Sequence, residues 1–396
     1  MLCAAKSAER GLDTILLDPN SVLGRKVRIT GKGRCNLSND CDIQTFMKNV
    51  PRNARFLYSS LARFSPQDTK AFFEGLGVPV KTERGNRMFP VSDKAADISD
   101  ALEKYMRSSG ARVLHLRAKS IITENGAVAG VNTNNGVIQC RAAVICTGGA
   151  SYPGTGSTGD GYRMAAALGH SVIPAHPSLV PLESDDPWCA QMQGFAPRNV
   201  LLTAFDGRGR KVYEEFGEML FTHFGVSGPL VLSASAHMRD FENEKYRLSI
   251  DLKPALDEQK LDERVLRDFA KYANRDFSNA LGDLAGRAMI PVLIQLSGIP
   301  GDTKVNSITK QQRRDLVALF KAFPVSVSGP RPIDEAIVTS GGVDVREVNP
   351  RTMESKLVDG LYFAGEVLDV DAYTGGFNLQ IAWSTGITAG TSVLQE

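Results

Sequence analysis

The sequence predicts an α/β domain that is interrupted by an insertion. Short apolar strands followed by glycine-rich loops fill the first part of the chain, and the same pattern returns after Arg331. Between about residues 178 and 335 the pattern changes, first to short alternating stretches and then to charged helical sequence. The length of 396 residues also suits two or three domains, at roughly 100–200 residues each.

Composition and charge exclude several classes of protein. With 46 basic and 44 acidic side chains the net charge is only +2, which argues against a dedicated nucleic-acid binder but leaves room for a local basic patch. No apolar run reaches the ~18 residues of a membrane span. The first residues, MLCAAKSAERGLD, are too charged for a secretory segment, so we expect a cytoplasmic protein.

The cysteines and histidines point to no metal or disulfide chemistry. The six cysteines form no C-x-x-C pair, which favours reduced thiols over a zinc ribbon or a dithiol redox motif. The histidines show no metal-ligand spacing, so no metal site is predicted.

The first elements are predicted in the following order. A helix ends near Gly11, and an apolar strand follows at 14–17, closed by Asp18. The segment 24–36, GRKVRITGKGRCN, is predicted to form a loop that is rich in glycine and positive charge. A more polar helical region then extends to about Ser109.

Strands dominate the next part. Residues 112–117 and 119–123 alternate enough to be strands, and 128–133 and 137–141 flank a hairpin turn of sequence NNG. A buried strand at 142–146 then leads into Thr147-Gly148-Gly149.

The insertion is predicted to have two parts, a β-rich unit and a helical segment, before a last apolar helix at about 378–394. The predicted division of the chain is 1–177 with 335–396 for the α/β domain, 178–254 with 324–334 for the β-rich domain, and 255–323 for the helical insert.

The glycine-rich turns make chemical sense if a dinucleotide lies across the edge of a parallel sheet. A pyrophosphate needs backbone N–H groups and no Cβ in the way, and glycine at a strand-to-helix turn provides both. A carboxylate at a strand end, as at Asp18, accepts hydrogen bonds from ribose hydroxyls. The alternative for Asp18 is a surface residue that starts the Pro19-Asn20 turn.

Two further glycine clusters follow. Residues 154–159 fit G-x-G-x-x-G, but the loop after the preceding strand is too long for that fingerprint, so a loop closing over a cofactor is the better interpretation. Near the C-terminus the apolar strand 360–364 runs into Gly365 and Glu366. Asp369, Gly375 and Gly376 follow before the last helix, whose amino end could stabilise negative charge on a flavin ring.

These blocks resemble those of the BaiN/RdsA-like FAD flavoprotein family, which includes aminoacetone-oxidase-like members. The resemblance covers essentially the whole chain and is carried by GRKVRITGKGRCNLSN, TGGASYPGTGSTGDGY, GEMLFTHFGVSGP, TSGGVDVREVNPRTMESK and GLYFAGEVLDVDAYTGGFNLQIAWSTG. It implies a two-dinucleotide-binding-type (Rossmann-like) FAD domain, split by a β-barrel-like domain and a helical domain.

The resemblance also implies which residues hold FAD. Those implied on the ADP and pyrophosphate side are Asp18 at the ribose, Gly24, Arg25 and Lys26 along the pyrophosphate, and Thr147, Gly148 and Gly149. Those implied at the pyrophosphate and ribitol are Gly365, Glu366 and Asp369. Those implied at the flavin are Gly31, Gly33, Arg34, Cys35 and Asn36, together with Gly375, Gly376, Phe377, Asn378 and Leu379. Members of this family begin with a strand and a G-x-G-x-x-G turn, whereas this sequence starts inside the following helix. We therefore expect either a longer natural protein or a truncated form that binds FAD poorly.

Two residues are candidates for a proton donor beside the flavin. Cys35 lies in the G-R-C-N stretch and His223 lies in F-T-H-F-G. The alternative for Cys35 is a small packing residue, and for His223 a structural histidine between two phenylalanines.

The predicted function is a cytoplasmic FAD-dependent oxidoreductase, in which NAD(P)H reduces the flavin and an electron-poor C=C bond accepts hydride. One alternative is dihydrouridine synthesis on ribosomal RNA, which would need basic groups that contact the RNA. Three such groups are candidates, unless they are ordinary surface charge: Lys48/Arg52/Arg55, Lys81/Arg84/Arg87 and Arg208/Arg210/Lys211. Two more hypotheses are oxygen as acceptor with an amine donor, and a non-catalytic scaffold that holds little flavin.

Overall fold

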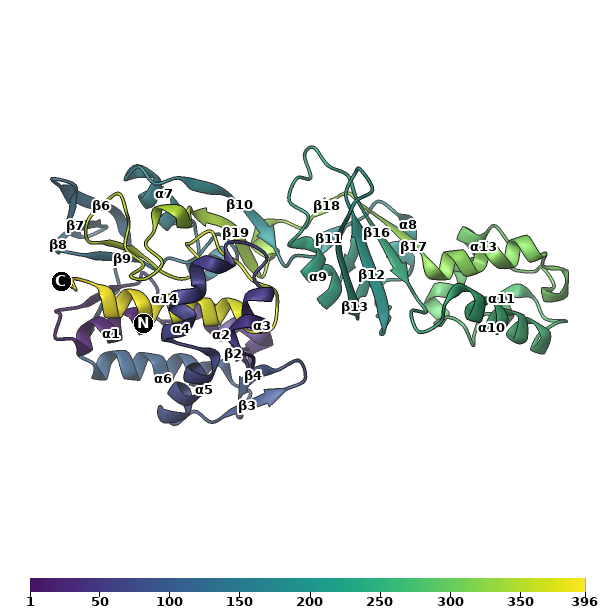
Figure 1. The fold of residues 1–396 in the computed structure, drawn as a ribbon, viewed down its shortest axis with the longest axis horizontal. Coiled ribbons are helices and arrows are strands. Elements are labelled where there is room, and N and C mark those ends of the chain that lie inside the picture. The colour runs from purple at the N-terminus through teal and green to yellow at the C-terminus, as the bar shows by residue number, and fades with distance from the viewer. Residues whose placement is uncertain (396) are drawn as a thin grey trace. The chain divides into compact units, whose positions relative to one another are not determined.

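The structure, a computed structural model, describes residues 1–395. It contains two compact units, one made of Met1–Ser178 together with the chain from Pro332 onward, and one made of Leu179–Arg331 (Figure 1). The α/β architecture interrupted by an insertion is therefore confirmed.

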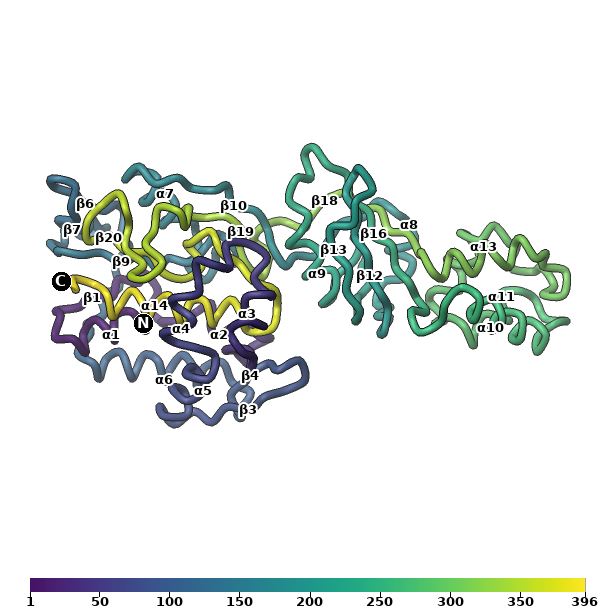
Figure 2. The backbone as a smooth tube through the Cα atoms, in the orientation of Figure 1, coloured from purple at the N-terminus to yellow at the C-terminus, as the bar shows by residue number. Residues whose placement is uncertain are grey.

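The first unit contains two pairs of parallel strands. β1 (Ile15–Leu17) pairs with β5 (Arg112–Leu114), and β9 (Ala143–Ile145) pairs with β20 (Leu361–Phe363). Parallel neighbours need long crossover connections, and here the connection between β9 and β20 includes the whole insertion (Figure 2). The strands at 14–17 and 142–146 are thus confirmed, each slightly shorter than predicted.

Helices precede or follow these strands along the chain. α1 (Leu2–Glu9) leads into β1, α6 (Ala95–Ser108) leads into β5, and α14 (Phe377–Ser392) follows β20. α14 is buried over most of its length and lies beside α1 (Figure 1). A Cβ at Gly390 would come within 2.5 Å of the Cys3 carbonyl oxygen, so glycine is what lets the two helices approach.

The segment predicted as a glycine loop, 24–36, begins with a helix instead. α2 (Arg25–Gly33) begins after Gly24, and its helical geometry breaks at Thr30, Gly31 and Lys32. Gly31 and Lys32 have φ of 56° and 59°, a left-handed backbone that turns the chain. The glycines therefore shape the end of a helix. The sequence did not predict this helix, because glycine and charged residues are so frequent in the segment.

The region predicted as helical up to Ser109 also contains a small sheet. Its helices before α6 are α3 (Ile43–Lys48), α4 (Tyr58–Arg63) and α5 (Pro66–Gly75). Its strands, in the order β2-β4-β3, are β2 (Ser38–Asn39), β3 (Val80–Glu83) and β4 (Arg87–Pro90). These strands have only two to four residues each, too few for a clear alternating pattern.

The remaining elements of the first unit include the predicted hairpin. The hairpin around NNG is confirmed, with β6 (Ala118–Glu124), β7 (Ala127–Thr133) and β8 (Gly136–Gln139) in one antiparallel sheet. α7 (Asp160–Ala167) comes next, and β10 (Val172–Ser178) pairs antiparallel with β19 (Val338–Val343).

The second unit contains two antiparallel four-stranded sheets. One has the order β13-β12-β16-β17, from β12 (Val200–Phe205), β13 (Lys211–Gly217), β16 (Tyr246–Asp251) and β17 (Phe323–Val327). The other has the order β14-β15-β11-β18, from β11 (Leu182–Glu183), β14 (Leu220–Thr222), β15 (Gly225–Ser227) and β18 (Gly329–Pro330). The barrel-like expectation is corrected: within residues 1–395 each sheet keeps two edge strands, and the ladders do not close.

Helices complete this unit. α8 (Pro187–Gln191) and α9 (Pro229–Ser235) belong to its β-rich part. The helical insertion between β16 and β17 comprises α10 (Glu258–Lys271), α11 (Phe277–Ala280), α12 (Ile290–Ser297) and α13 (Lys310–Lys321). α10 buries Leu261, Val265 and Phe269, one residue per turn, in a core shared with the strands. A separate helical domain at 255–323 therefore stays a prediction. Among residues 1–395, no helix combines the length and apolar character that crossing a membrane requires.

Candidate cofactor site

A cavity of about 740 Å³ opens in the first unit where β1 and β9 end. Asp18 directly follows β1, and Thr147 and Gly148 come soon after β9. Ligands of open parallel sheets bind at the carboxyl ends of the strands, so the position suits a cofactor. The predicted cofactor residues that line this one cavity are Asp18, Gly24, Arg25, Lys26, Thr147 and Gly148.

The loop 154–159 also contributes to the wall of the cavity. Thr155, Gly156 and Ser157 line it, at and just after the end of a short 3-10 turn that precedes α7. This position agrees with the interpretation of a loop that closes over a cofactor.

Asp18 takes part in a turn at the mouth of the cavity. Its Oδ1 accepts hydrogen bonds from the backbone N–H of Asn20 at 2.8 Å and from Asn20 Nδ2 at 2.9 Å. Arg25 Nη1 donates to Asn20 Oδ1 at 2.8 Å, which ties α2 to this turn. The two interpretations of Asp18 are therefore compatible, because the carboxylate starts the turn and lines the cavity.

A polar network joins α2 to the loop after β20. Lys26 Nζ lies 2.7 Å from Glu366 Oε2 and donates to Ser151 Oγ at 2.7 Å. Glu366 Oε1 accepts from Ser151 Oγ at 3.2 Å and from the Thr339 N–H at 2.9 Å. Thr339 Oγ1 accepts from the N–H groups of Ala150 and Ser151. Ser151 and Thr339 are not among the predicted site residues, although both belong to the family-like blocks.

Gly149 is needed for packing at this network. A Cβ there would come within 2.4 Å of Thr339 Oγ1. Gly365, by contrast, has φ of 78° and its nearest neighbour for a Cβ is Ala382 Cβ at 3.8 Å. Gly365 therefore serves the backbone turn after β20, while Gly149 lets the loop after β9 contact β19.

A second cluster of predicted residues forms where the α2–β2 loop meets the start of α14. The side-chain amide of Asn36 is oriented so that its nitrogen faces acceptors and its oxygen faces a donor. In this orientation its oxygen accepts from the Gly376 N–H at 3.0 Å. Asn39 Nδ2 donates to the Gly375 carbonyl oxygen at 3.0 Å. A Cβ at Gly376 would lie 2.2 Å from the Ser38 carbonyl oxygen, so no other residue fits there. The structure thus brings the predicted flavin-side loops together.

Other predicted flavin-side residues have structural partners. Arg34 pairs with Glu83 at 2.8 Å and lies over the Phe89 ring. Asn378 holds its own loop, since its Oδ1 accepts from the Ala372 N–H at 2.9 Å. Four more positions complete this set. Phe377 is buried edge-on to Phe46, and Leu379 packs on an apolar cluster. Gly31 and Gly33 shape the end of α2.

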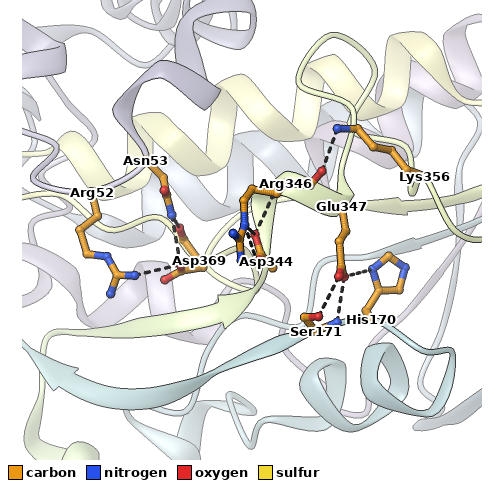
Figure 3. Close-up of polar contacts among 9 residues, drawn as sticks. All are labelled: Arg52, Asn53, His170, Ser171, Asp344, Arg346, Glu347, Lys356 and Asp369. Carbon is orange, nitrogen blue, oxygen red and sulfur yellow. Dashed lines mark hydrogen bonds and ion pairs between the residues drawn. The ribbon is translucent and has the colours of Figure 1, made fainter.

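Asp369 is a buried carboxylate with an incomplete set of partners (Figure 3). Its Oδ2 lies 3.3 Å from Arg52 Nη2 and accepts from Asn53 Nδ2 at 3.0 Å. Its Oδ1 is buried without a hydrogen-bond partner. Burial raises the pKa of Asp369, an effect that Arg52 and Asn53 oppose. The sequence showed Arg52 only as a member of a basic group.

The two catalytic candidates occupy different surroundings. Cys35 is completely buried in the cluster that contains Leu37, Phe73 and Trp383, and burial raises the pKa of its thiol to about 12. This environment favours the packing interpretation. His223 is exposed in the turn between β14 and β15, so it belongs to the second unit, whereas Cys35 belongs to the first.

Many members of the three basic groups have carboxylate partners. Arg52 pairs with Asp369 and Lys81 with Asp93. In the second unit the pairs are Arg208–Glu244, Arg210–Asp206 and Lys211–Glu214. Internal pairing of this kind favours the interpretation as surface charge over a built RNA surface.

Comparisons with known proteins cover nearly the full chain. The family profile described as HI0933-like protein Rossmann domain matches residues 1–392. The chain is 30% identical over 404 residues to 3-dehydro-bile acid delta(4,6)-reductase of Clostridium scindens, covering 99% of this chain and 95% of that protein. It is 31% identical over 393 residues to ribosomal RNA dihydrouridine synthase of Escherichia coli, covering 97% of this chain and 93% of that protein. Among solved structures, 3-ketosteroid-delta4-(5alpha)-dehydrogenase from Rhodococcus jostii gives a TM-score of 0.49 at 15% identity, covering 100% of this chain and 94% of that one.

Proposed function

Since the chain belongs to the family of HI0933-like Rossmann-domain proteins, as its motifs predict, we propose that it is an FAD-dependent oxidoreductase. The observation that carries this proposal is the convergence of six predicted ADP-side residues on one cavity at the carboxyl ends of β1 and β9. The flavin-side loops meet separately, at Asn36 and Gly376.

The residues present fit FAD. Asp18 lines the cavity and would bind the ribose. Lys26 also lines it, contacts Glu366 and Ser151, and would bind the diphosphate. The buried Asp369 Oδ1, which lacks a partner, suits a ligand hydroxyl such as those of the ribitol chain. When bound, FAD supplies hydride transfer, and the protein supplies binding, orientation and electrostatics.

We propose NAD(P)H as electron donor and an electron-poor C=C bond as acceptor. Two relatives support the acceptor by their names, a delta(4,6)-reductase and a dihydrouridine synthase, since both reactions saturate a ring double bond. In this chain Gly376 and Asn36 fix the amino end of α14, whose dipole favours negative charge nearby. Cys35, buried as a neutral thiol, packs the loop that carries Asn36.

The second candidate is reduction of a uracil base in ribosomal RNA. The identity to a ribosomal RNA dihydrouridine synthase supports it, while the internally paired basic groups favour a small molecule. Mass spectrometry of ribosomal RNA from a deletion strain separates the two, because unchanged dihydrouridine would remove the RNA substrate. If oxygen is the acceptor and an amine is the donor, the protein would show oxidase activity. If it is a scaffold without catalysis, it would hold no flavin.

The direct test is anaerobic reduction of the FAD-loaded protein. We expect NADH or NADPH to bleach the flavin absorbance, and a steroid-like conjugated ketone to restore it. Failure of both nicotinamides to reduce the bound flavin would contradict the proposed donor, and failure of the ketone would move the acceptor to uracil or oxygen.

A further inference from the structure

A second pocket lies in the first unit, apart from the cofactor cavity. Its volume is about 450 Å³, within the range of roughly 300–1,000 Å³ that small-molecule sites occupy. One wall comes from residues 53–56, between α3 and α4, and the other from residues 345–356, between β19 and β20. Among residues 1–395, no residue lines both this pocket and the cofactor cavity, so it is a separate candidate site.

The pocket combines apolar walls with positive charge. Phe56, Val345 and Val348 belong to its lining and are otherwise buried. The three cations of the lining are Arg55, Arg346 and Lys356. None of the described residues that line the pocket carries a carboxylate. Small-molecule sites are mostly apolar, with a few polar groups that fix the orientation, so this lining suits a ligand with an apolar body and an anionic group.

Each of the three cations has donors to spare. The Arg55 side chain is exposed and makes no hydrogen bond or ion pair within residues 1–395. Lys356 Nζ donates to the Arg346 carbonyl oxygen at 2.8 Å, which leaves two of its three donors free (Figure 3). Arg346 bonds to Asp344 through Nε and Nη2, with Nε 2.9 Å from Oδ2, and keeps Nη1 for a ligand.

The balance of charge favours a phosphate over other anions. Asp344 neutralises Arg346, so Arg55 and Lys356 give the pocket two uncompensated positive charges. A phosphate monoester carries about −1.5 to −2 charges at pH 7, whereas a carboxylate or a sulfate ester is singly charged. Phosphate also offers three acceptor oxygens, one for each cation.

Hydrogen bonds hold the second wall in place before any ligand binds. Glu347 Oε2 accepts from the Ser171 N–H at 2.8 Å and lies 3.3 Å from His170 Nδ1, so this carboxylate is engaged away from the three cations (Figure 3). His170 Nε2 lies 3.0 Å from the Oγ of Ser355, which directly precedes Lys356. The Lys356 N–H donates to the Glu347 carbonyl oxygen at 2.8 Å. A wall fixed in this way needs little ordering on binding, which favours affinity.

We propose that this pocket binds a small molecule that carries a phosphate monoester on an apolar body. The phosphate oxygens contact Arg55, Arg346 Nη1 and Lys356 Nζ. The apolar body packs on Phe56 and Val348. Such a site goes beyond the proposed function, because none of these contacts involves flavin or nicotinamide.

The probe that tests this site is phenyl phosphate, added to the full chain in the presence of saturating FAD. Phenyl sulfate keeps the ring but is singly charged, so it is the matched comparison, and inorganic phosphate and phenol each supply one half of the ligand. Binding is followed by the methyl signals of Val345 and Val348 in NMR spectra, which report both affinity and place. The variants are Arg55→Met and Lys356→Met, and the controls are Arg84→Met, exposed outside the pocket, and Lys26→Met, in the cofactor cavity.

We expect phenyl phosphate to shift both valine signals and to bind about 10-fold more tightly than each of the other three compounds. Either variant should weaken its binding by about 10-fold, the loss of one charge-assisted contact, and both controls should match the parent protein. Unshifted valine signals, or unchanged affinity in both variants, would overturn the proposal.

Three further outcomes would also overturn it. Equal affinity for phenyl sulfate would remove the preference for phosphate, and equal affinity for inorganic phosphate would show an adventitious ion only. A loss of binding in Lys26→Met alone would place the phosphate in the cofactor cavity. Failure of FAD to bind would contradict the proposed function only, because the two valine signals report this pocket directly.

Discussion

Lys26 Nζ lies 2.7 Å from Glu366 Oε2, and this ion pair joins the first helix after β1 to the loop after β20. Both residues lie among those that the family resemblance places at the pyrophosphate. A lysine held by a carboxylate at a helix start can turn its charge to a phosphate when one binds, because the ammonium has three donors.

Replacing this lysine should weaken FAD binding. Lys26→Met removes a charge-assisted contact and leaves the Glu366 carboxylate unopposed near the diphosphate. Such contacts are worth about 1.5–3 kcal/mol, so we expect Kd to rise by roughly 10- to 100-fold in fluorescence titration. Lys104→Met, an exposed position on α6, is the control and should leave Kd unchanged. Equal Kd values for FAD in both variants would show that Lys26 does not contribute to FAD binding.

The contact between Gly376 and Ser38 should make Gly376 one of the least replaceable glycines. In Gly376→Ala the new Cβ would meet the Ser38 carbonyl oxygen and the φ of 99° would be strained, so we expect a loss above about 3 kcal/mol. Gly77→Ala is the control, with a φ of 83° and open space around it, and should cost about 1–2 kcal/mol. Urea unfolding measures both. Similar losses would show that backbone strain alone, and not the packing of the two loops, fixes Gly376.

Local sequence patterns account for only part of the site. Asp18 and the Thr147-Gly148 turn were predictable because each follows a short apolar strand. The helix α2 was not predictable, because the three glycines and five basic residues in 24–36 favour a loop over a helix in the sequence. Pairs such as Arg52–Asp369 join residues more than 300 positions apart, and no local pattern reports them.

The Asp369 carboxylate should make stability depend on pH in an unusual direction. Its pKa is raised on folding, so its stabilising contribution is complete below the ordinary value of about 3.9 and is lost as pH rises through the folded-state pKa. Arg52→Met should therefore cost about 1–3 kcal/mol at pH 7 and less at pH 4.5, measured by urea unfolding. Arg55→Met, exposed nearby, serves as the control. A loss that is larger at the lower pH would contradict this account.

The Cys35 thiol should likewise respond to alkaline pH. Because its folded pKa is about 12, its contribution is complete below the unfolded value of about 8.5 and declines above it by up to about 1.4 kcal/mol per pH unit. Cys35→Ala should cost roughly 1 kcal/mol at pH 7, and the gap to the parent protein should close or reverse at pH 10. If the thiol only packs the loop, the variant should also retain turnover. A gap that stays constant with pH, or complete loss of turnover, would argue for a catalytic thiol.

The measurement that tests the central claim most directly is a stoichiometric FAD titration of the protein, followed by flavin fluorescence. We expect one FAD to bind per chain and the affinity to fall in the Lys26→Met variant but not in the Lys104→Met control. A protein that binds no FAD, or an affinity that is the same in both variants, would contradict the cofactor assignment.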